Sequence, residues 1–268
     1  MTLVAILMGT LVAGIGSVWL AAALSFGALA RYTQHMLSLA AGALMATAFL
    51  HLLPEAFESQ AAAKDLFLTL LLGLVFFFLL DKAELWHHGH EHHHHGDDHG
   101  AVHAHDHDHD HGHNHTPPQA GSWAILTGDS VHCFGDGILI ASAFMADMRL
   151  GAIASLAVLA HEVPHHMGDL MVLRSGASNK RMALVKVSLA GAVTALGGLA
   201  GYWLVDLLHD YLPYFLVVAS SSFVYVALAD LIPQLQKRLT LAETVAQITW
   251  LLVGIGMVTV LSGLAHGH

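Results

Sequence analysis

The sequence contains few charged residues. Asp, Glu, Lys and Arg make up 11% of its 268 residues, whereas a soluble globular protein contains roughly a quarter. Hydrophobic residues account for 55% of the chain, and the mean hydropathy is +0.60. This composition excludes a soluble globular domain and indicates an integral membrane protein. At roughly 20 residues per spanning helix, the chain has room for up to about eight spans and no sizeable soluble domain.

Basic residues and cysteine are scarce as well. The 10 Lys and Arg residues, against 20 Asp and Glu, give nucleic-acid binding no electrostatic basis. Cys133 is the single cysteine, which excludes an intrachain disulfide and therefore a disulfide-stapled secreted scaffold. No positive charge precedes the apolar amino-terminal stretch. It lacks the basic region of a cleavable signal peptide and is predicted to be a span.

Long apolar stretches are what the sequence has in abundance. They cover residues 1–24, 36–54, 66–80, 123–146, 151–173, 183–206, 213–233 and 245–265. We therefore predict an all-α integral membrane protein with eight transmembrane helices in a single domain, 1-268, interrupted by a long polar connection at 82–121. The later stretches contain His, Asp, Glu, Gly and Pro at bilayer depth, which indicates that they line a polar path.

The basic residues predict the orientation, because Lys and Arg are enriched in cytoplasmic connections. When the connections are numbered in order, the even ones contain only Lys64 and Arg149. The odd ones contain Arg31, Lys82, Arg174, Lys180, Arg181, Lys186, Lys237 and Arg238. The odd connections are therefore predicted to be cytoplasmic, with both termini extracytoplasmic and the connection at 82–121 in the cytoplasm.

The connection at 82–121 is of low complexity and contains 15 of the 24 histidines. Such a composition cannot bury an apolar core, so the segment is predicted to be disordered. Neutral imidazoles beside carboxylates bind borderline metal ions weakly and at many positions. The candidate capture residues are His92, His93, His94, His95, His105, His107 and His109. A solvated loop without a role is the alternative interpretation.

Ionisable residues inside the fourth and fifth predicted spans give the strongest functional signal. Two pairs of residues are four positions apart, so each pair lies on one helix face. An ionisable group at bilayer depth costs about 2.5–3.5 kcal/mol, and a bound cation would compensate for a cluster of them. Nitrogen and oxygen donors from two packed helices suit tetrahedral Zn(II). The predicted ligands are His132, Asp136, His161 and His165, with Glu162 beside them.

The motifs in these spans resemble those of a known family. Residues 128–144, GDSVHCFGDGILIASAF, are similar to the fourth-span motif HNxxDG of the ZIP (Zrt/Irt-like) metal transporters. Residues 161–169, HEVPHHMGD, resemble the fifth-span motif HExPHExGD, and the segments 49–55 and 223–233 extend the resemblance. It implies a ZIP-like eight-helix bundle, uptake of zinc or another divalent metal (Cd, Fe or Mn) into the cytoplasm, and commonly a homodimer.

The resemblance also assigns residues by position. It implies that the predicted ligands form the primary metal site, and that His51 and Asp230 flank the pathway. Two residues depart from the family pattern, since Cys133 replaces the usual Asn and His166 the usual Glu. Some relatives bind a second ion through those oxygen donors, so a single transport site is expected here. The auxiliary metal or pathway candidates are Cys133, His166, Asp169, His51 and Asp230.

Cys133 has two interpretations. Its soft sulfur would favour Zn(II) or Cd(II) over Mn(II) or Fe(II) if it faces the ion. Alternatively, it is a small buried residue that only packs. Since metal binding requires neutral imidazole, we expect the affinity for metal to fall as the pH drops through about 6.5.

Two other classes of protein share parts of the pattern. Residues 161–165 match the H-E-x-x-H motif of metalloproteases, but Pro164 kinks that segment and His132 would be unexplained. Exporters of the cation diffusion facilitator class share His-rich loops and an H-x3-D spacing, but resemble six-span bundles with a cytosolic carboxyl-terminal domain. We therefore expect a transporter in the plasma (inner) membrane with Zn(II) as substrate, no catalytic cofactor and no enzymatic activity.

Overall fold

The computed structural model describes residues 1–25, 33–89, 120–176, 180–232 and 240–265. These residues fold into helices, and no strand is found among them. The seven candidate capture residues of the histidine-rich connection, His92 to His95, His105, His107 and His109, lie outside the described residues.

The helices follow the predicted apolar stretches closely. The first stretch forms α1 (Thr2–Leu11), the π-helix η1 (Val12–Gly16) and α2 (Ser17–Ser25). The second forms α3 (Thr33–Thr47), the π-helix η3 (Ala48–Leu52) and α4 (Leu53–Phe57). Next come α5 (Ala63–Gly89), α6 (Ala120–Ala146), α7 (Met148–Gly176) and α8 (Lys180–Leu207). The short 3-10 helix η4 (His209–Tyr211) leads to α9 (Leu212–Tyr225) and the π-helix η5 (Val226–Leu231), and α11 (Leu241–Ala265) comes last.

The main difference from the sequence prediction concerns the third span. Its apolar run ends near residue 80, but α5 remains helical to Gly89 and α6 begins at Ala120. The polar connection predicted at 82–121 therefore begins and ends with helical residues. A helix continues past its apolar run because backbone hydrogen bonding does not require apolar side chains.

Six helical segments in the described residues are long and apolar enough to cross a membrane. They span Thr2–Leu24, Gln34–Phe57, Ala63–Leu80, Arg181–Leu207, His209–Ala229 and Leu241–Val260. The described residues are thus all-helical, with six candidate membrane spans, in agreement with the predicted class. Helices α6 and α7 are 27 and 29 residues long, which is enough to cross a membrane. Their ionisable residues, however, make their mean hydropathy too low for them to be counted among these six segments.

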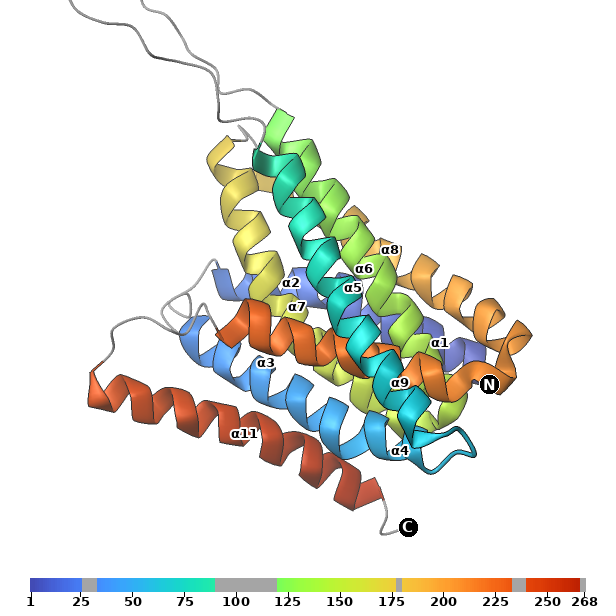
Figure 1. Ribbon diagram of the computed structural model, residues 1–268. Helices are drawn as coiled ribbons and strands as arrows, with labels where there is room; N and C mark the ends of the chain where they lie inside the picture. The colour runs from blue at the N-terminus through green and yellow to red at the C-terminus, as the bar shows by residue number, and fades with distance from the viewer. Residues whose placement is uncertain (26–32, 90–119, 177–179, 233–239, 266–268) are drawn as a thin grey trace, which may run out of the picture.

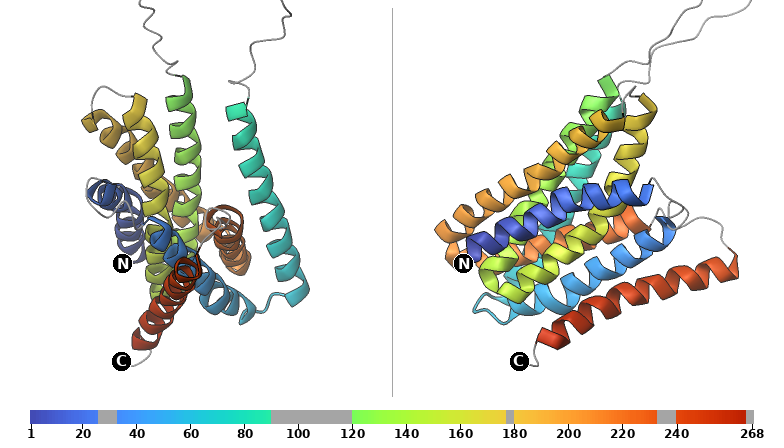
Figure 2. Two further views of the ribbon diagram at one scale, coloured as in Figure 1. Left: turned by 90° about the vertical axis from the view of Figure 1, so that its left-hand side faces the viewer. Right: turned by 180° about the vertical axis from the view of Figure 1, so that it is seen from behind.

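The helices that bear these ionisable residues are packed on several sides. Helix α6 packs against α8 and α7, while α1 contacts all three of them. On the other side, α3 packs against α7 and α11, and α9 against α5 and α6. Figures 1 and 2 show that the beginning of α1 and the end of α11 lie towards one end of the bundle. The end of α5 and the beginning of α6 lie towards the other end.

Glycines bring the backbones of α6 and α8 into direct contact. A Cβ atom at Gly197 would lie 2.0 Å from the carbonyl oxygen of Phe134, and one at Gly137 would lie 2.0 Å from that of Thr194. Any side chain at either position would collide with backbone atoms of the other helix. Small residues of this kind allow close helix packing in membranes. The contact fixes the position of α6 directly beside His132 and Asp136.

Pro164 lies inside α7 and is buried. Because proline has no N–H group, the carbonyl of Ala160 loses its usual helical donor, which favours a change of direction. Figure 1 shows that α7 changes direction along its length, as the proline predicts.

Candidate metal site

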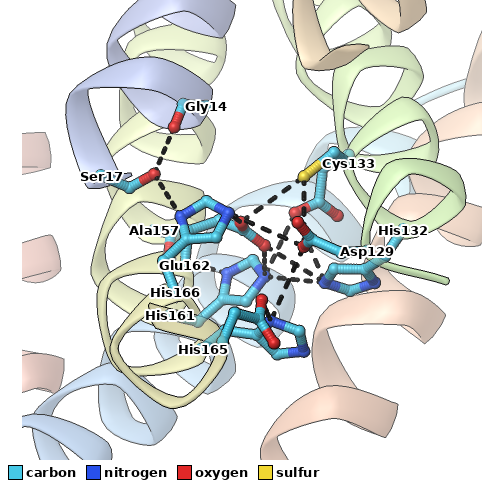
Figure 3. Close-up of polar contacts among 12 residues, drawn as sticks. Gly14, Ser17, Asp129, His132, Cys133, Ala157, His161, Glu162, His165 and His166 are labelled. Atoms are coloured by element: carbon cyan, nitrogen blue, oxygen red, sulfur yellow. Dashed lines mark hydrogen bonds and ion pairs between the residues drawn. The ribbon is translucent and has the colours of Figure 1, made fainter. Parts of the chain in front are cut away.

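Ligand-type side chains of α6 and α7 meet near the middle of both helices. Figure 3 shows the imidazole rings and carboxylates of the two helices pointing towards one another. In three groups the ligand atoms all lie within 4.8 Å of each other, and two of these groups have four members. Site A consists of His132, Asp136, His161 and Glu162. Site B consists of Asp129, Cys133, Glu162 and His166. Glu162 belongs to both sites.

The nitrogen and oxygen atoms of site A are closely spaced. His161 Nε2 lies 3.1 Å from Asp136 Oδ2, 3.2 Å from Glu162 Oε1 and 3.4 Å from His132 Nε2. His132 Nε2 lies 3.3 Å from Glu162 Oε1 and 3.9 Å from Asp136 Oδ2. With bonds of about 2.0–2.1 Å, the ligands of a tetrahedral zinc ion lie about 3.3 Å apart. The spacing in site A therefore suits zinc.

The protonation of His161 follows from its surroundings. His161 Nδ1 lies 3.3 Å from the carbonyl oxygen of Ala157, which can only accept a hydrogen bond. The ring is therefore protonated on Nδ1 when neutral, and Nε2 keeps a lone pair that faces the carboxylates. Asp136 Oδ2 and Glu162 Oε1 are buried and accept no hydrogen bond from the residues that the structure describes. A cation would satisfy all of these atoms at once.

Site A is closed on most sides. The side chains of Asp136, His161 and Glu162 are almost completely buried, whereas that of His132 is 27% exposed. An ion held here would keep a single open side at His132.

The predicted ligand His165 lies next to site A but outside the group of four. Its ring stacks on that of His132, with centroids 5.4 Å apart and planes inclined by 21°. Its Nδ1 lies 3.5 Å from Asp169 Oδ2 and 3.8 Å from Asp129 Oδ1, and its side chain is 38% exposed. His165, Asp129 and Asp169 form a third group of donors beside the first two.

Site B contains a residue that the sequence analysis did not select as a ligand. Asp129 Oδ1 lies 3.7 Å from Cys133 Sγ and 3.7 Å from His166 Nε2, and all three side chains are buried. Its separation of four residues from Cys133 is the same signal that identified His132 and Asp136. The spacing would therefore have found Asp129 if Cys133 had been treated as a ligand.

The remaining predicted residues lie elsewhere. His51 is in η3 and Asp230 in η5, two π-helical segments, and the side chain of Asp230 lies outside the described part. His51 lines a cavity of about 400 Å³, together with Glu55, Glu58 and Asp147. Neither residue belongs to the three groups found among the described residues.

The family model of the ZIP zinc transporters matches residues 1–262. The chain belongs to the ZIP family. The family predicted from the motifs is thus confirmed, and its members are metal transporters rather than enzymes. This decides against the metalloprotease and the cation diffusion facilitator exporter.

Individual zinc transporters match part of this ZIP chain. It is 38% identical to human zinc transporter ZIP4 over 115 residues, which are 43% of this chain and 18% of the human protein. It is 32% identical to zinc transporter ZIP10 of Danio rerio over 148 residues, 53% of this chain and 18% of that protein. Zinc transporter foi of Drosophila melanogaster is 32% identical over 151 residues, 55% of this chain and 21% of that protein. The matched region therefore spans about a fifth of these relatives.

Proposed function

We propose that this ZIP protein transports Zn(II) across a membrane into the cytoplasm and binds the ion at site A on the way. The observation that carries the proposal is the spacing of the site A ligand atoms, 3.1 to 3.9 Å, near the middle of two long helices. The three relatives described above are zinc transporters, which supports the same cargo. Zn(II) is the substrate here, and no catalytic cofactor takes part.

In this proposal α6 and α7 complete a set of eight spans in one domain, 1-268, although each is polar. Their ionisable side chains face each other and the neighbouring helices rather than lipid, which is how charged groups are tolerated in a bilayer. The even number of spans leaves both termini on one side. The distribution of Lys and Arg makes that side extracytoplasmic and the histidine-rich connection cytoplasmic.

The exposure of the side chains along α7 supports a direction of release. His161 is buried, whereas His165 and Asp169, four and eight residues further along the same helix, are 38% and 14% exposed. They lead towards the end of α7, where the sequence has the basic residues Arg174, Lys180 and Arg181. We therefore propose that the ion leaves site A past His165 and Asp169, and that the histidine-rich connection receives it in the cytoplasm.

On the other side of the membrane, the cavity lined by His51 provides a mouth for the ion. Carboxylates at Glu55, Glu58 and Asp147 attract hydrated cations to it. Transport then requires α6 and α7 to change their exposure relative to the rest of the bundle. This is alternating access without covalent chemistry. The family resemblance supports a homodimer in the plasma (inner) membrane, with Asp230 flanking the path.

Zinc uptake into sealed vesicles that contain the purified full chain tests the proposal. We expect saturable uptake by the unchanged protein and none above background for His161→Ala, because site A loses its central nitrogen. His209→Ala is the matched control, since His209 is exposed in η4 and belongs to none of the three groups. Absence of saturable uptake by the unchanged protein, or normal uptake by folded His161→Ala, would overturn the proposal.

A further inference from the structure

An apolar cavity of about 570 Å³ lies behind the helix that carries half of site A. Four of its lining residues belong to α7, namely Leu156, Leu159, Ala160 and Val163. The other walls come from α2, α3 and α11, and Figure 2 shows α11 running beside α3 at the edge of the bundle. We call this space the α7 cavity. Its volume is typical of a binding site for a small molecule, roughly 300–1,000 Å³.

The α7 cavity and site A contact opposite faces of α7. Residues three and four positions apart share a helix face, so Leu156, Ala160 and Val163 form one row. Successive residues are about 100° apart, so Glu162 points about 160° away from Ala160. Glu162 accordingly belongs to site A, whereas Ala160 lines the cavity. A molecule in the cavity would therefore contact α7 directly behind the metal ligands, beside the kink at Pro164.

The lining suits a hydrocarbon rather than a metal ion. Among the described residues that line the cavity there is no Asp, Glu, Lys or Arg, and all but two have apolar side chains. The two exceptions are His35 and Trp250, whose rings stack with centroids 5.8 Å apart and planes inclined by 23°. One imidazole is too few ligands for Zn(II), which takes four. The cavity is therefore not part of the metal path.

The α7 cavity also lies at the depth of the bilayer. The lining parts of α2, α3 and α11 belong to three of the six candidate membrane spans. Its lining residues Leu20, Leu156 and Trp250 are 39% to 45% exposed, so the cavity opens towards the lipid that surrounds the spans. Lipid chains fill apolar space at this depth, because empty space loses dispersion contacts with the atoms around it.

The charges at one end of the cavity indicate which lipid fits. His35 lies near the beginning of α3, at the end of the span that the basic residues predict to be cytoplasmic. In the sequence, Arg31 comes just before α3, and Lys237 and Arg238 come just before α11. The segments 26–32 and 233–239 contain no acidic residue. Positive charge at the cytoplasmic ends of two spans favours an anionic lipid headgroup.

We propose that the α7 cavity binds one acyl chain of an anionic phospholipid, with the headgroup at His35 and the chain against α7. A chain that moves from the bilayer into the protein gains nothing from the hydrophobic effect, so packing and the headgroup determine its affinity. A ligand shifts a protein towards the conformation that binds it. The bound chain therefore stabilises this arrangement of α3, α7 and α11. It slows the change in exposure of α7 that transport requires, and this consequence rests on the proposed function, whereas the binding does not.

Photolabelling of the purified full chain in phosphatidylcholine vesicles tests the binding. The probe is phosphatidylglycerol with a diazirine in its acyl chain, and peptide mass spectrometry locates the labels. We expect labels on the α7 residues that line the cavity. Met36→Trp fills the cavity from α3 and Met257→Trp fills it from α11, so each should remove these labels. Met8→Trp is the matched control, because Met8 is 60% exposed in α1 and does not line the cavity.

The same experiment distinguishes the headgroups. A phosphatidylcholine probe with the same diazirine chain should label the cavity less than the phosphatidylglycerol probe. Labels confined to the outer faces of the helices, or unchanged cavity labels in a folded Met36→Trp or Met257→Trp protein, would overturn the binding of an acyl chain. Equal labelling of the cavity by both probes would overturn the preference for an anionic lipid.

Zinc uptake into vesicles with and without phosphatidylglycerol tests the consequence for transport. The maximal rate should fall with phosphatidylglycerol in the unchanged protein and in Met8→Trp, but not in Met36→Trp, where the cavity is already filled. Lipid charge at the vesicle surface acts on all three proteins alike, so the difference between them reports the cavity. An equal response in all three would overturn the effect on transport. The proposed transport function fails separately, if the unchanged protein is labelled in the cavity but shows no saturable zinc uptake.

Discussion

Helices α6 and α7 differ sharply from α5 and α11 in what they bury. The first pair buries ionisable groups, among them Asp136, His161 and Glu162, and its mean hydropathy is too low for a typical membrane span. The most apolar parts of α5 and α11 have the hydropathy of typical membrane spans, but only 11% of the residues in those parts are buried inside the protein. Hydropathy therefore identifies apolar helices, whether they are exposed or buried, while the spacing of polar residues predicts those that line the path.

The largest effect that this comparison predicts is the loss of a ligand from the polar pair. His132→Ala should reduce saturable zinc uptake by more than about 100-fold, beyond the range seen when only a ligand's supporting partner is lost. Membrane insertion should persist, because an alanine is easier to insert than a histidine. Uptake per inserted molecule in sealed vesicles measures both quantities. Near-normal uptake would remove His132 from the site.

His165→Ala tests a second predicted ligand of the polar helices α6 and α7. The sequence predicts that His165 is a primary ligand, and we expect its loss to abolish saturable uptake, because a primary ligand is needed to hold the ion. Uptake that stays saturable with a changed maximal rate would instead assign His165 to the exit path alone. The same vesicle measurement separates the two roles.

The site shows which of its residues can be predicted from the spacing of polar residues along the sequence. Pairs four residues apart on one helix identified His132, Asp136, His161 and His165, because neighbours on a helix face can be recognised within one segment. Ser17 could not be found this way, since its contact with His166 joins segments 149 residues apart. A single serine in an apolar stretch also matches no metal-binding pattern. Contacts between distant helices depend on packing that local periodicity does not encode.

The apolar runs predicted the positions of the helices correctly but placed the end of α5 too early, and both results have the same cause. In the part of the chain that the structure describes, each predicted apolar run is helical, because lipid-facing and buried helices both require apolar side chains. The same apolar runs predicted that the third helix would end near residue 80, whereas α5 continues for nine more residues, to Gly89. Polar residues beyond a membrane's surface do not stop a helix when no proline or capping residue intervenes.

The next largest effect concerns the lipid-facing pair. Leu252 in α11 is 58% exposed, so Leu252→Lys would place a charge against lipid at a cost of about 2.5–3.5 kcal/mol. We expect a lower yield of membrane-inserted protein, measured by fractionation, whereas Leu252→Ala should insert normally. Unchanged insertion of the lysine variant would mean that another copy or another helix covers this face.

A smaller effect on stability is expected from helix packing, which is closer around α6 than around α11. Gly197→Ala should lower stability by about 1–3 kcal/mol, because its Cβ would press against the Phe134 backbone and push α8 away from α6. At Gly256 in α11 a Cβ would have no atom of another described helix within 4 Å, so Gly256→Ala is the matched control and should be tolerated. Thermal unfolding of both variants in detergent measures the difference. Equal melting temperatures would contradict close contact between α6 and α8.

The smallest predicted effect is a change of preference rather than a loss. Cys133 is completely buried on α6, one position from His132 along the chain, and its sulfur is within 3.7 Å of two carboxylates. Cys133→Asn replaces the soft sulfur with an amide and restores the family's usual residue. We expect transport to continue, with the ratio of Cd(II) to Mn(II) uptake reduced because the amide oxygen is a harder donor.

Thiol labelling provides an independent measurement of the same contact. If Cys133 binds the ion, Zn(II) should slow its reaction with an alkylating reagent in the unchanged protein, because the metal-bound thiolate is shielded. In His166→Ala this protection should require a higher zinc concentration, since site B loses its nitrogen. An unchanged uptake ratio in Cys133→Asn, together with labelling that zinc does not slow, would show that the thiol only packs. In that case zinc selectivity in this chain would have to come from the histidines of site A.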